Sequence, residues 1–109
     1  MSPHLKILKQ VRKAAAKRIL FLAHAVKQMS RPERMISAAE IRRVVRTGQV
    51  IEDYPEDTRG HSCLILGRGK GRRPIHVVCS PKFDYLAIIT AYLPSREEWE
   101  DNFRRRRQQ

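Results

Sequence analysis

The chain changes character near residue 48, where the spacing of its hydrophobic positions changes. Before that point, apolar residues recur every three or four positions, which is typical of amphipathic helices. After it, they gather in short runs rich in valine, isoleucine and tyrosine, which is typical of strands. The pattern therefore predicts an α+β fold with amino-terminal helices followed by a sheet.

The first expected helix covers residues 4–17, with lysines on its polar faces and an alanine-rich end. The run Arg18–Leu22 fits either a continuation of this helix or a short apolar strand, because its length does not decide between them. The residues predicted to form the apolar stripe of the helix are Leu5, Leu8, Val11 and Ala15.

Two more helices are expected before residue 49. Residues 24–29 form a short one, which ends before Pro32. The next begins at Ser37, where Ser37 and Glu40 have the spacing of a capping box, and Gly48 ends it. Its expected apolar stripe is Ile41, Val44 and Val45.

The second half predicts a four-stranded antiparallel sheet, because short connections separate its apolar runs. A glycine-spaced basic turn, residues 67–73, joins the middle strands, and Ser95 and Glu98 predict a short carboxy-terminal helix. The chain is thus expected to have a basic helical extension (1–17), a single α+β domain (18–103) and a basic tail (104–109). The expected strands are residues 49–54, 61–66, 74–79 and 85–92.

Charge narrows the class of partner. The chain has 23 lysines and arginines against 11 acidic residues, for a net charge of +12. Residues 1–48 carry 12 basic and 2 acidic groups (+10), whereas residues 49–109 carry 11 and 9 (+2). Such an uneven positive field attracts phosphate backbones, anionic lipid or an acidic protein, and among these RNA is the expected partner.

Location and redox state follow from two further features. The apolar run 19–23 is too short for a signal peptide, and the chain has no stretch of about 20 apolar residues that would span a membrane. We therefore expect a cytoplasmic protein without a membrane partner. Cys63 and Cys79 are expected to be reduced core thiols, although a disulfide between two strands stays possible.

Three basic segments are candidates for phosphate contact: the first helix, the turn 67–73 and the arginine tail. The turn is not a P-loop, because no Gly-Lys-Ser/Thr sequence opens a helix. Its alternative interpretation is a solvated hairpin loop. The acidic run 52–57 lacks a defined order of metal ligands, so neither a metal nor a cofactor is expected. The candidate nucleic-acid-binding residues are Lys13, Lys17, Arg18, Lys27, Arg68, Lys70, Arg72 and Arg73.

Histidines are the candidate acid–base groups. RNA can be cleaved without metal by a base, an acid and cations on the phosphate. His24 and His76 are the candidates for these roles, with a hydrogen-bonded structural histidine as the alternative for each. Thr90 and Tyr92 lie two positions apart on the last strand, so both hydroxyls are expected on one face, where ordinary sheet packing is the alternative.

Several short motifs carry a family resemblance. They are His24-Ala-x-x-Gln28-Met, Arg34-x-Ile-Ser37, Gly48-x-Val-Ile-Glu52-x-Tyr54-Pro55, Pro74-Ile-His76, Ile88-Ile-Thr90-Ala-Tyr92-x-Pro94 and Trp99. In order and spacing these motifs resemble a bacterial family of domains of unknown function, over about residues 19–99. The resemblance implies a fold similar to that of RelE-like ribonuclease toxins.

The resemblance also implies an activity and its residues. Proteins of this kind look like the toxin of a toxin–antitoxin pair, which cuts mRNA without metal, in some cases on the ribosome, and binds a cognate antitoxin. By position, the implied catalytic residues are His24, Arg34, His76, Thr90 and Tyr92. Gln28 stands where an arginine is common, and residues 1–17 lie outside the shared region.

The leading hypothesis is therefore a metal-independent endoribonuclease toxin. A first alternative is a module that binds RNA or DNA without cleaving it, and it predicts salt-sensitive binding without products. A second alternative is a protein-interaction subunit whose basic face contacts an acidic partner, and it predicts little affinity for RNA at physiological salt.

Overall fold

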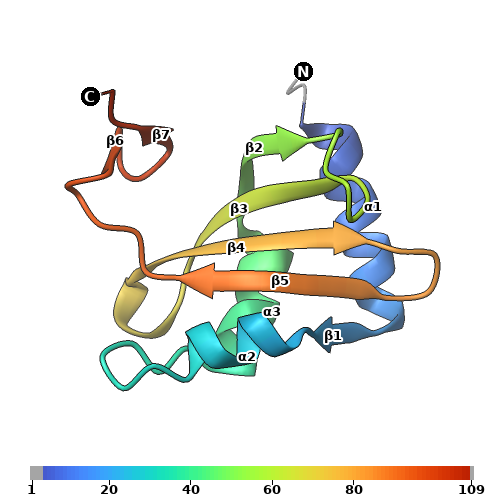
Figure 1. The fold of residues 1–109 in the computed structure, drawn as a ribbon, viewed down its shortest axis with the longest axis horizontal. Coiled ribbons are helices and arrows are strands. Elements are labelled where there is room, and N and C mark those ends of the chain that lie inside the picture. The colour runs from blue at the N-terminus through green and yellow to red at the C-terminus, as the bar shows by residue number, and fades with distance from the viewer. Residues whose placement is uncertain (1–3, 109) are drawn as a thin grey trace.

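The computed structural model describes residues 4–108, which form helices packed on a sheet and a small carboxy-terminal hairpin (Figure 1). No helix within this range combines the length and apolarity that a membrane span needs. In chain order the elements are α1 (Leu5–Lys17), β1 (Ile19–Phe21), α2 (Ala23–Met29), α3 (Ala38–Thr47), β2 (Gln49–Tyr54), β3 (Ser62–Arg68), the 3-10 turn η1 (Lys70–Arg72), β4 (Pro74–Pro81), β5 (Leu86–Tyr92), β6 (Trp99–Glu100) and β7 (Arg105–Arg106).

The main sheet has five strands in the order β1-β5-β4-β3-β2. Strands β2 to β5 form the expected antiparallel meander, but β1 pairs in parallel with β5, with Ile19 opposite Leu86. The prediction of a four-stranded antiparallel sheet is therefore wrong, and the correct description is a mixed sheet. The short run Ile19–Phe21 resolves as a strand because β5 offers it an unpaired edge, which local sequence cannot reveal.

The expected carboxy-terminal helix is also wrong. Residues after Ser95 make one turn, and Trp99 then begins a hairpin in which β6 pairs with β7. Asp101, Asn102 and Phe103 all have positive φ angles, a left-handed conformation that no α-helix contains. Burial of Trp99 and Phe103 against the sheet prevails over the capping signal of Ser95.

One face of the sheet is covered by the helix layer, and α1 and α3 pass behind the strands in Figure 1. The main core forms there, and α1 contributes Ile7, Val11 and Ala14 to it. The buried stripe of α1 is thus rotated from the predicted one, of which only Val11 is fully buried. On α3 the predicted stripe of Ile41, Val44 and Val45 is confirmed as buried.

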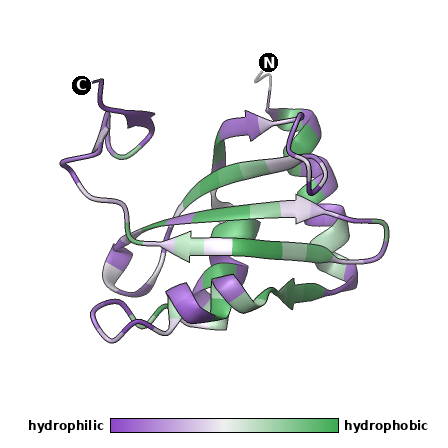
Figure 2. Cartoon of the chain, in the orientation of Figure 1, coloured by the Kyte–Doolittle hydropathy of each residue, from purple (hydrophilic) through white to green (hydrophobic). Residues whose placement is uncertain are grey.

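The opposite face of the sheet carries a second, separate cluster. Leu64 and Leu66 of β3 pack there against Trp99 and Phe103 of the hairpin. In Figure 2 the central strands are largely hydrophobic, whereas the carboxy-terminal segment is mostly hydrophilic. The hairpin therefore attaches to the sheet through a few apolar side chains.

Helix α3 crosses β3 at Gly67, and this contact leaves no room for a side chain. A Cβ atom at position 67 would lie 2.9 Å from the Val44 Cα atom of α3. We expect Gly67→Ala to lower the free energy of unfolding by about 3 kcal/mol, because backbone cannot rotate away as a side chain can. Urea unfolding measures this change. Gly71→Ala is the control: its φ is +63° and nothing lies within 4 Å, so strain alone should cost roughly 1 kcal/mol.

Candidate nucleic-acid interface and covered acid–base cluster

The polar side of α3 is rich in arginine. Its apolar residues face the core, so Arg42, Arg43 and Arg46 are exposed. Residues four apart lie on one side of a helix, so Arg42 and Arg46 border one side of α3, whereas Arg43 and Thr47 border the other. Each side of α3 borders a hollow in the surface of the molecule.

The first hollow, here called the α3–β3 hollow, has a volume of about 420 Å³. None of the described residues that line it is acidic. Arg68 donates a hydrogen bond from Nη2 to Asn102 Oδ1 over 2.9 Å, which ties this wall to the hairpin. Four arginines from four different segments line the hollow: Arg43, Arg68, Arg72 and Arg104.

The second hollow, the α1–α3 hollow, has a volume of about 540 Å³ and lies on the other side of α3. Its described lining also holds no acidic residue. Arg12 is fixed there, because its Nε donates to the Val45 carbonyl oxygen and its Nη2 to that of Gly48, each over 3.1 Å. The arginines that line it are Arg12, Arg18, Arg42 and Arg46.

The arginines that line these two hollows are suited to binding phosphate groups. A guanidinium group is always charged, and its planar fork matches two oxygens of a phosphate. Eight arginines on both sides of one helix therefore suit a chain of phosphates that crosses α3. The sequence indicated Arg18, Arg68 and Arg72 individually, and Arg12 and Arg104 as parts of the first helix and the arginine tail, but it missed Arg42, Arg43 and Arg46. The pattern Arg42-Arg43-x-x-Arg46, opposite the apolar stripe of α3, is the sequence signal that could have found the arginines of this helix.

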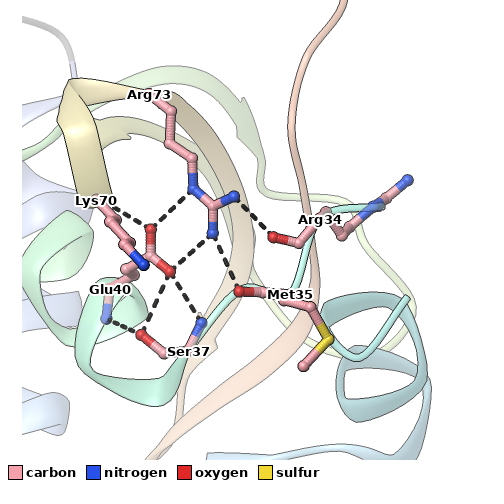
Figure 3. Close-up of polar contacts among 6 residues, drawn as sticks. All are labelled: Arg34, Met35, Ser37, Glu40, Lys70 and Arg73. Atoms are coloured by element: carbon pink, nitrogen blue, oxygen red, sulfur yellow. Dashed lines mark hydrogen bonds and ion pairs between the residues drawn. The ribbon is translucent and has the colours of Figure 1, made fainter. Parts of the chain in front are cut away.

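The Arg73 side chain is held by hydrogen bonds to other groups of the protein (Figure 3). Its Nε and Nη2 donate to the carboxylate of Glu40 over 3.0 and 2.9 Å, and its Nη1 donates to the Arg34 carbonyl oxygen over 2.7 Å. Glu40 also accepts from the backbone N–H groups of Ser37 and Lys70. Arg73 thus joins α3 to the 67–73 turn, and its guanidinium faces a carboxylate instead of solvent.

The charge of Glu40 is strongly stabilised. Burial would raise the pKa of this carboxyl, but the hydrogen bonds from Arg73, Lys70 and Ser37 outweigh it and lower the pKa from 4.5 to about 2. The capping box predicted for Ser37 and Glu40 is confirmed, since Ser37 Oγ also accepts from the Glu40 N–H over 3.1 Å.

The remaining candidate cations are scattered. Lys17 donates to the Phe83 carbonyl oxygen over 3.0 Å and lies 5.0 Å from the centre of its ring. Lys13 is exposed beside it on α1, Lys27 is exposed on α2, and Lys70 is exposed in η1. The structure does not bring these four lysines into either arginine-lined hollow.

His76 is completely buried on the face of the sheet opposite the helices. Its Nδ1 lies 3.2 Å from the Tyr92 hydroxyl oxygen, and its Nε2 lies 2.9 Å from the Phe103 carbonyl oxygen. The Trp99 ring packs edge-on against the imidazole, with 4.4 Å between ring centres. Burial lowers the pKa of His76 to about 4, although the hydrogen bond to Phe103 opposes the shift. The ring is therefore neutral at pH 7.

Other polar groups join His76 on this face. Thr90 and Tyr92 lie opposite Val78 and His76 in the register of β4 and β5, so the prediction that they share a face is confirmed. Burial raises the pKa of Tyr92 to about 12. On the edge strand β2, the Tyr54 hydroxyl donates to the Glu52 carboxylate, which also accepts from Arg106 Nε over 2.9 Å. Arg106 in turn lies 4.7 Å from the centre of the Trp99 ring.

His24 and Arg34 stand apart from this group. His24 is exposed on α2, whose buried residues Ala25 and Met29 belong to the core of the helix layer. Arg34 is half-buried between α2 and α3, and its Nη1 is buried with no hydrogen-bond partner among residues 4–108. The structure thus assembles His76, Thr90 and Tyr92, and it places His24 on an element of the other layer.

Carboxylates of the acidic run have hydrogen-bond partners within the chain. Asp53 lies 2.5 Å from His61 Nε2, and Asp57 accepts from Arg59 and Ser62. The described residues hold no group of three histidine, cysteine, aspartate or glutamate side chains suited to a metal ion. Cys63 and Cys79 face each other as free, buried thiols across β3 and β4.

Comparison with known proteins adds one relationship. The model of a family described as a domain of unknown function, DUF4258, matches residues 21–93. The matched region begins after α1 and ends before the hairpin, so it contains α3 and the five strands but for the first two residues of β1. Neither the curated proteins nor the solved structures contain a match to this chain.

Proposed function

The chain belongs to the DUF4258 family, and on that premise we propose that it is an RNA-binding protein whose binding surface is α3 with the hollow on each side of it. The observation that carries this proposal is the set of eight arginines that line the two hollows, without an acidic residue among the described lining. A neutral ligand, or an acidic ligand that is not a polyanion, does not require so many arginines.

The shape of the surface favours a flexible strand of phosphates. The two hollows are separated by the width of α3, and one strand that bends over the helix reaches arginines on both sides. A single-stranded RNA bends in this way more readily than a duplex, whose phosphates follow a fixed helical path. The net charge of +12 adds long-range attraction to the same ligand.

A binding titration tests this proposal. The fluorescence anisotropy of a labelled single-stranded RNA is measured with the protein over a range of salt concentrations. For single strands, the slope of log K against log salt is roughly −0.7 for each neutralised phosphate, so contact with at least four phosphates predicts a slope of about −3 or steeper. A flat salt dependence, or equal affinity for an acidic polypeptide, would favour the protein-interaction alternative.

Metal-independent RNA cleavage is the second candidate function, and the group of acid–base side chains around His76 favours it. In this reaction the 2′-oxygen bonds to phosphorus as the bond to the 5′-oxygen breaks, which gives a 2′,3′-cyclic phosphate and a 5′-hydroxyl. One group takes the proton of the 2′-hydroxyl and another protonates the leaving 5′-oxygen. His76 and Tyr92 are the candidate proton carriers on the sheet, whereas His24, the other candidate from the sequence, lies apart from them on α2. A toxin role with a cognate antitoxin rests on this candidate.

We expect RNA incubated with the protein and EDTA to yield 2′,3′-cyclic phosphate ends, which chromatography detects. His76→Ala should lower the cleavage rate at least 100-fold, since general acid–base groups contribute about 10²- to 10⁴-fold. His61→Ala is the matched control and should leave the rate unchanged, because His61 pairs with Asp53 outside this group. Intact RNA after incubation with a folded wild-type sample would count against cleavage.

A further inference from the structure

Residues 99–106, here called the C-terminal strap, cover the acid–base group around His76. Trp99 and Phe103 are almost completely buried, at 3% and 7% exposure, and both pack on the sheet. The Phe103 carbonyl oxygen occupies the Nε2 side of His76. The strap therefore closes the only face of the sheet, among the described residues, that no helix covers.

The apolar contacts of the strap are separate from the main core. They form the small cluster with Leu64 and Leu66, whereas the helices and the other sheet face form a different core. The two strands of the strap, β6 and β7, pair only with each other and not with the five-stranded sheet. Displacement of the strap would thus expose one face of the sheet and leave the main core intact.

The turn of the strap is held in an unfavourable conformation. Asp101, Asn102 and Phe103 have φ angles of 53°, 55° and 69° in succession. A bulky residue such as phenylalanine rarely adopts this left-handed conformation, so the packed state of the strap stores strain. Release of the Phe103 side chain from the sheet would relieve it.

The positive charges of the strap provide a means to displace it from the sheet. The strap ends in consecutive arginines: Arg106 pairs with Glu52 of β2, and Arg105 pairs with Glu100 within the strap, each at 2.9 Å. These arginines are exposed, so phosphates in solution compete for them directly. Arg104, which follows Phe103 in the chain, lines the α3–β3 hollow that we assign to RNA.

We propose that the C-terminal strap is displaced by RNA, whose phosphates bind Arg104, Arg105 and Arg106, take Arg106 from Glu52 of β2 and draw Trp99 and Phe103 off the sheet. This inference rests on the proposed RNA-binding function. Displacement uncovers His76, Tyr92 and Tyr54 as a site for RNA, with aromatic and imidazole rings available to stack on bases. The covered face is then a second binding site that forms only when the arginine surface is occupied.

Trp99 is the single tryptophan of the chain, so its fluorescence reports the strap directly. The full-length protein is titrated with a single-stranded RNA while anisotropy of the labelled RNA reports binding. In parallel, acrylamide quenching and the emission maximum of Trp99 report its exposure. We expect the quenching constant to rise several-fold and the emission to shift to longer wavelength as the RNA saturates.

A pair of charge variants sharpens the test. Glu52→Gln removes the partner of Arg106, so less RNA, by several-fold, should bring Trp99 to half-maximal exposure. Glu33→Gln is the control, since Glu33 pairs with Arg31 far from the strap in sequence and is mostly exposed. Saturating RNA that leaves Trp99 shielded would overturn the strap proposal and leave RNA binding standing. Absence of any anisotropy change would overturn both.

Discussion

Glu40→Ala should lower the free energy of unfolding by about 3 kcal/mol, because it leaves a largely buried guanidinium without its counter-charge. The carboxylate receives bonds from Arg73 and from the backbone of Ser37 and Lys70, so one substitution removes the link between α3 and the 67–73 turn. Because the Arg73 side chain keeps 27% exposure, the cost falls at the lower end of the range for buried pairs. Urea unfolding at pH 7 measures it.

The same carboxylate gives stability a defined pH dependence. Its pKa is about 2 in the folded protein against an ordinary value of 4.5, so the folded state binds its proton less readily. The stabilisation is therefore complete above pH 4.5 and is lost as the pH falls through about 2. A shift of this size corresponds to about 3 kcal/mol. The Glu40→Ala variant should lack this part of the acid transition, whereas Glu97→Ala, at an exposed position, should retain it.

The largest expected effect on binding comes from the two sides of α3 together. We expect Arg42→Gln, Arg43→Gln, Arg46→Gln and Arg72→Gln, combined in one variant, to weaken RNA binding about 100- to 1,000-fold at 0.1 M salt. Each lost phosphate contact removes roughly 0.7 from the salt slope, which corresponds to about fivefold in affinity at that concentration. The slope itself should become shallower by about 3 for the four contacts.

A variant with the same net charge separates position from charge. Lys6→Gln, Lys9→Gln, Lys27→Gln and Arg31→Gln also remove four cations, but none of them lines either arginine hollow. This control should lose affinity only through the weaker overall field and keep a slope close to that of the wild type. Equal losses in the two variants would mean that RNA is attracted by net charge without a defined site. All these side chains are exposed, so folding is expected to survive in both variants.

Local sequence predicted those parts of the fold whose signals are local. The Ser37–Glu40 capping box and the apolar stripe of α3 were correct, and the antiparallel pairing of β2 to β5 followed from short connections. The parallel pairing of Ile19–Phe21 with β5 joins segments more than sixty residues apart, and no local pattern encodes it. At Ser95 a genuine capping signal failed because Trp99 gains more from burial on the sheet than from a short helix.

The sequence predicted only part of the candidate site, because local patterns do not encode contacts between distant segments. Alternation along a strand placed Thr90 and Tyr92 on one face, and this placement holds. The interior role of Arg73 depends on a carboxylate 33 positions away, and the burial of His76 depends on a hairpin that the sequence suggested as a helix. Arginine hollows form between elements, so their members are visible only after α1, α3 and β3 pack.

The central claim, that RNA binds across α3, is tested most directly by following the side-chain Nε–Hε signals of the arginines in ¹⁵N NMR spectra during an RNA titration. The account predicts that the signals of Arg42, Arg43, Arg46 and Arg72 shift together and saturate with the binding curve, while that of Arg73, paired with Glu40, stays in place. Shifts confined to arginines outside both hollows, with the α3 signals unchanged at saturation, would contradict it.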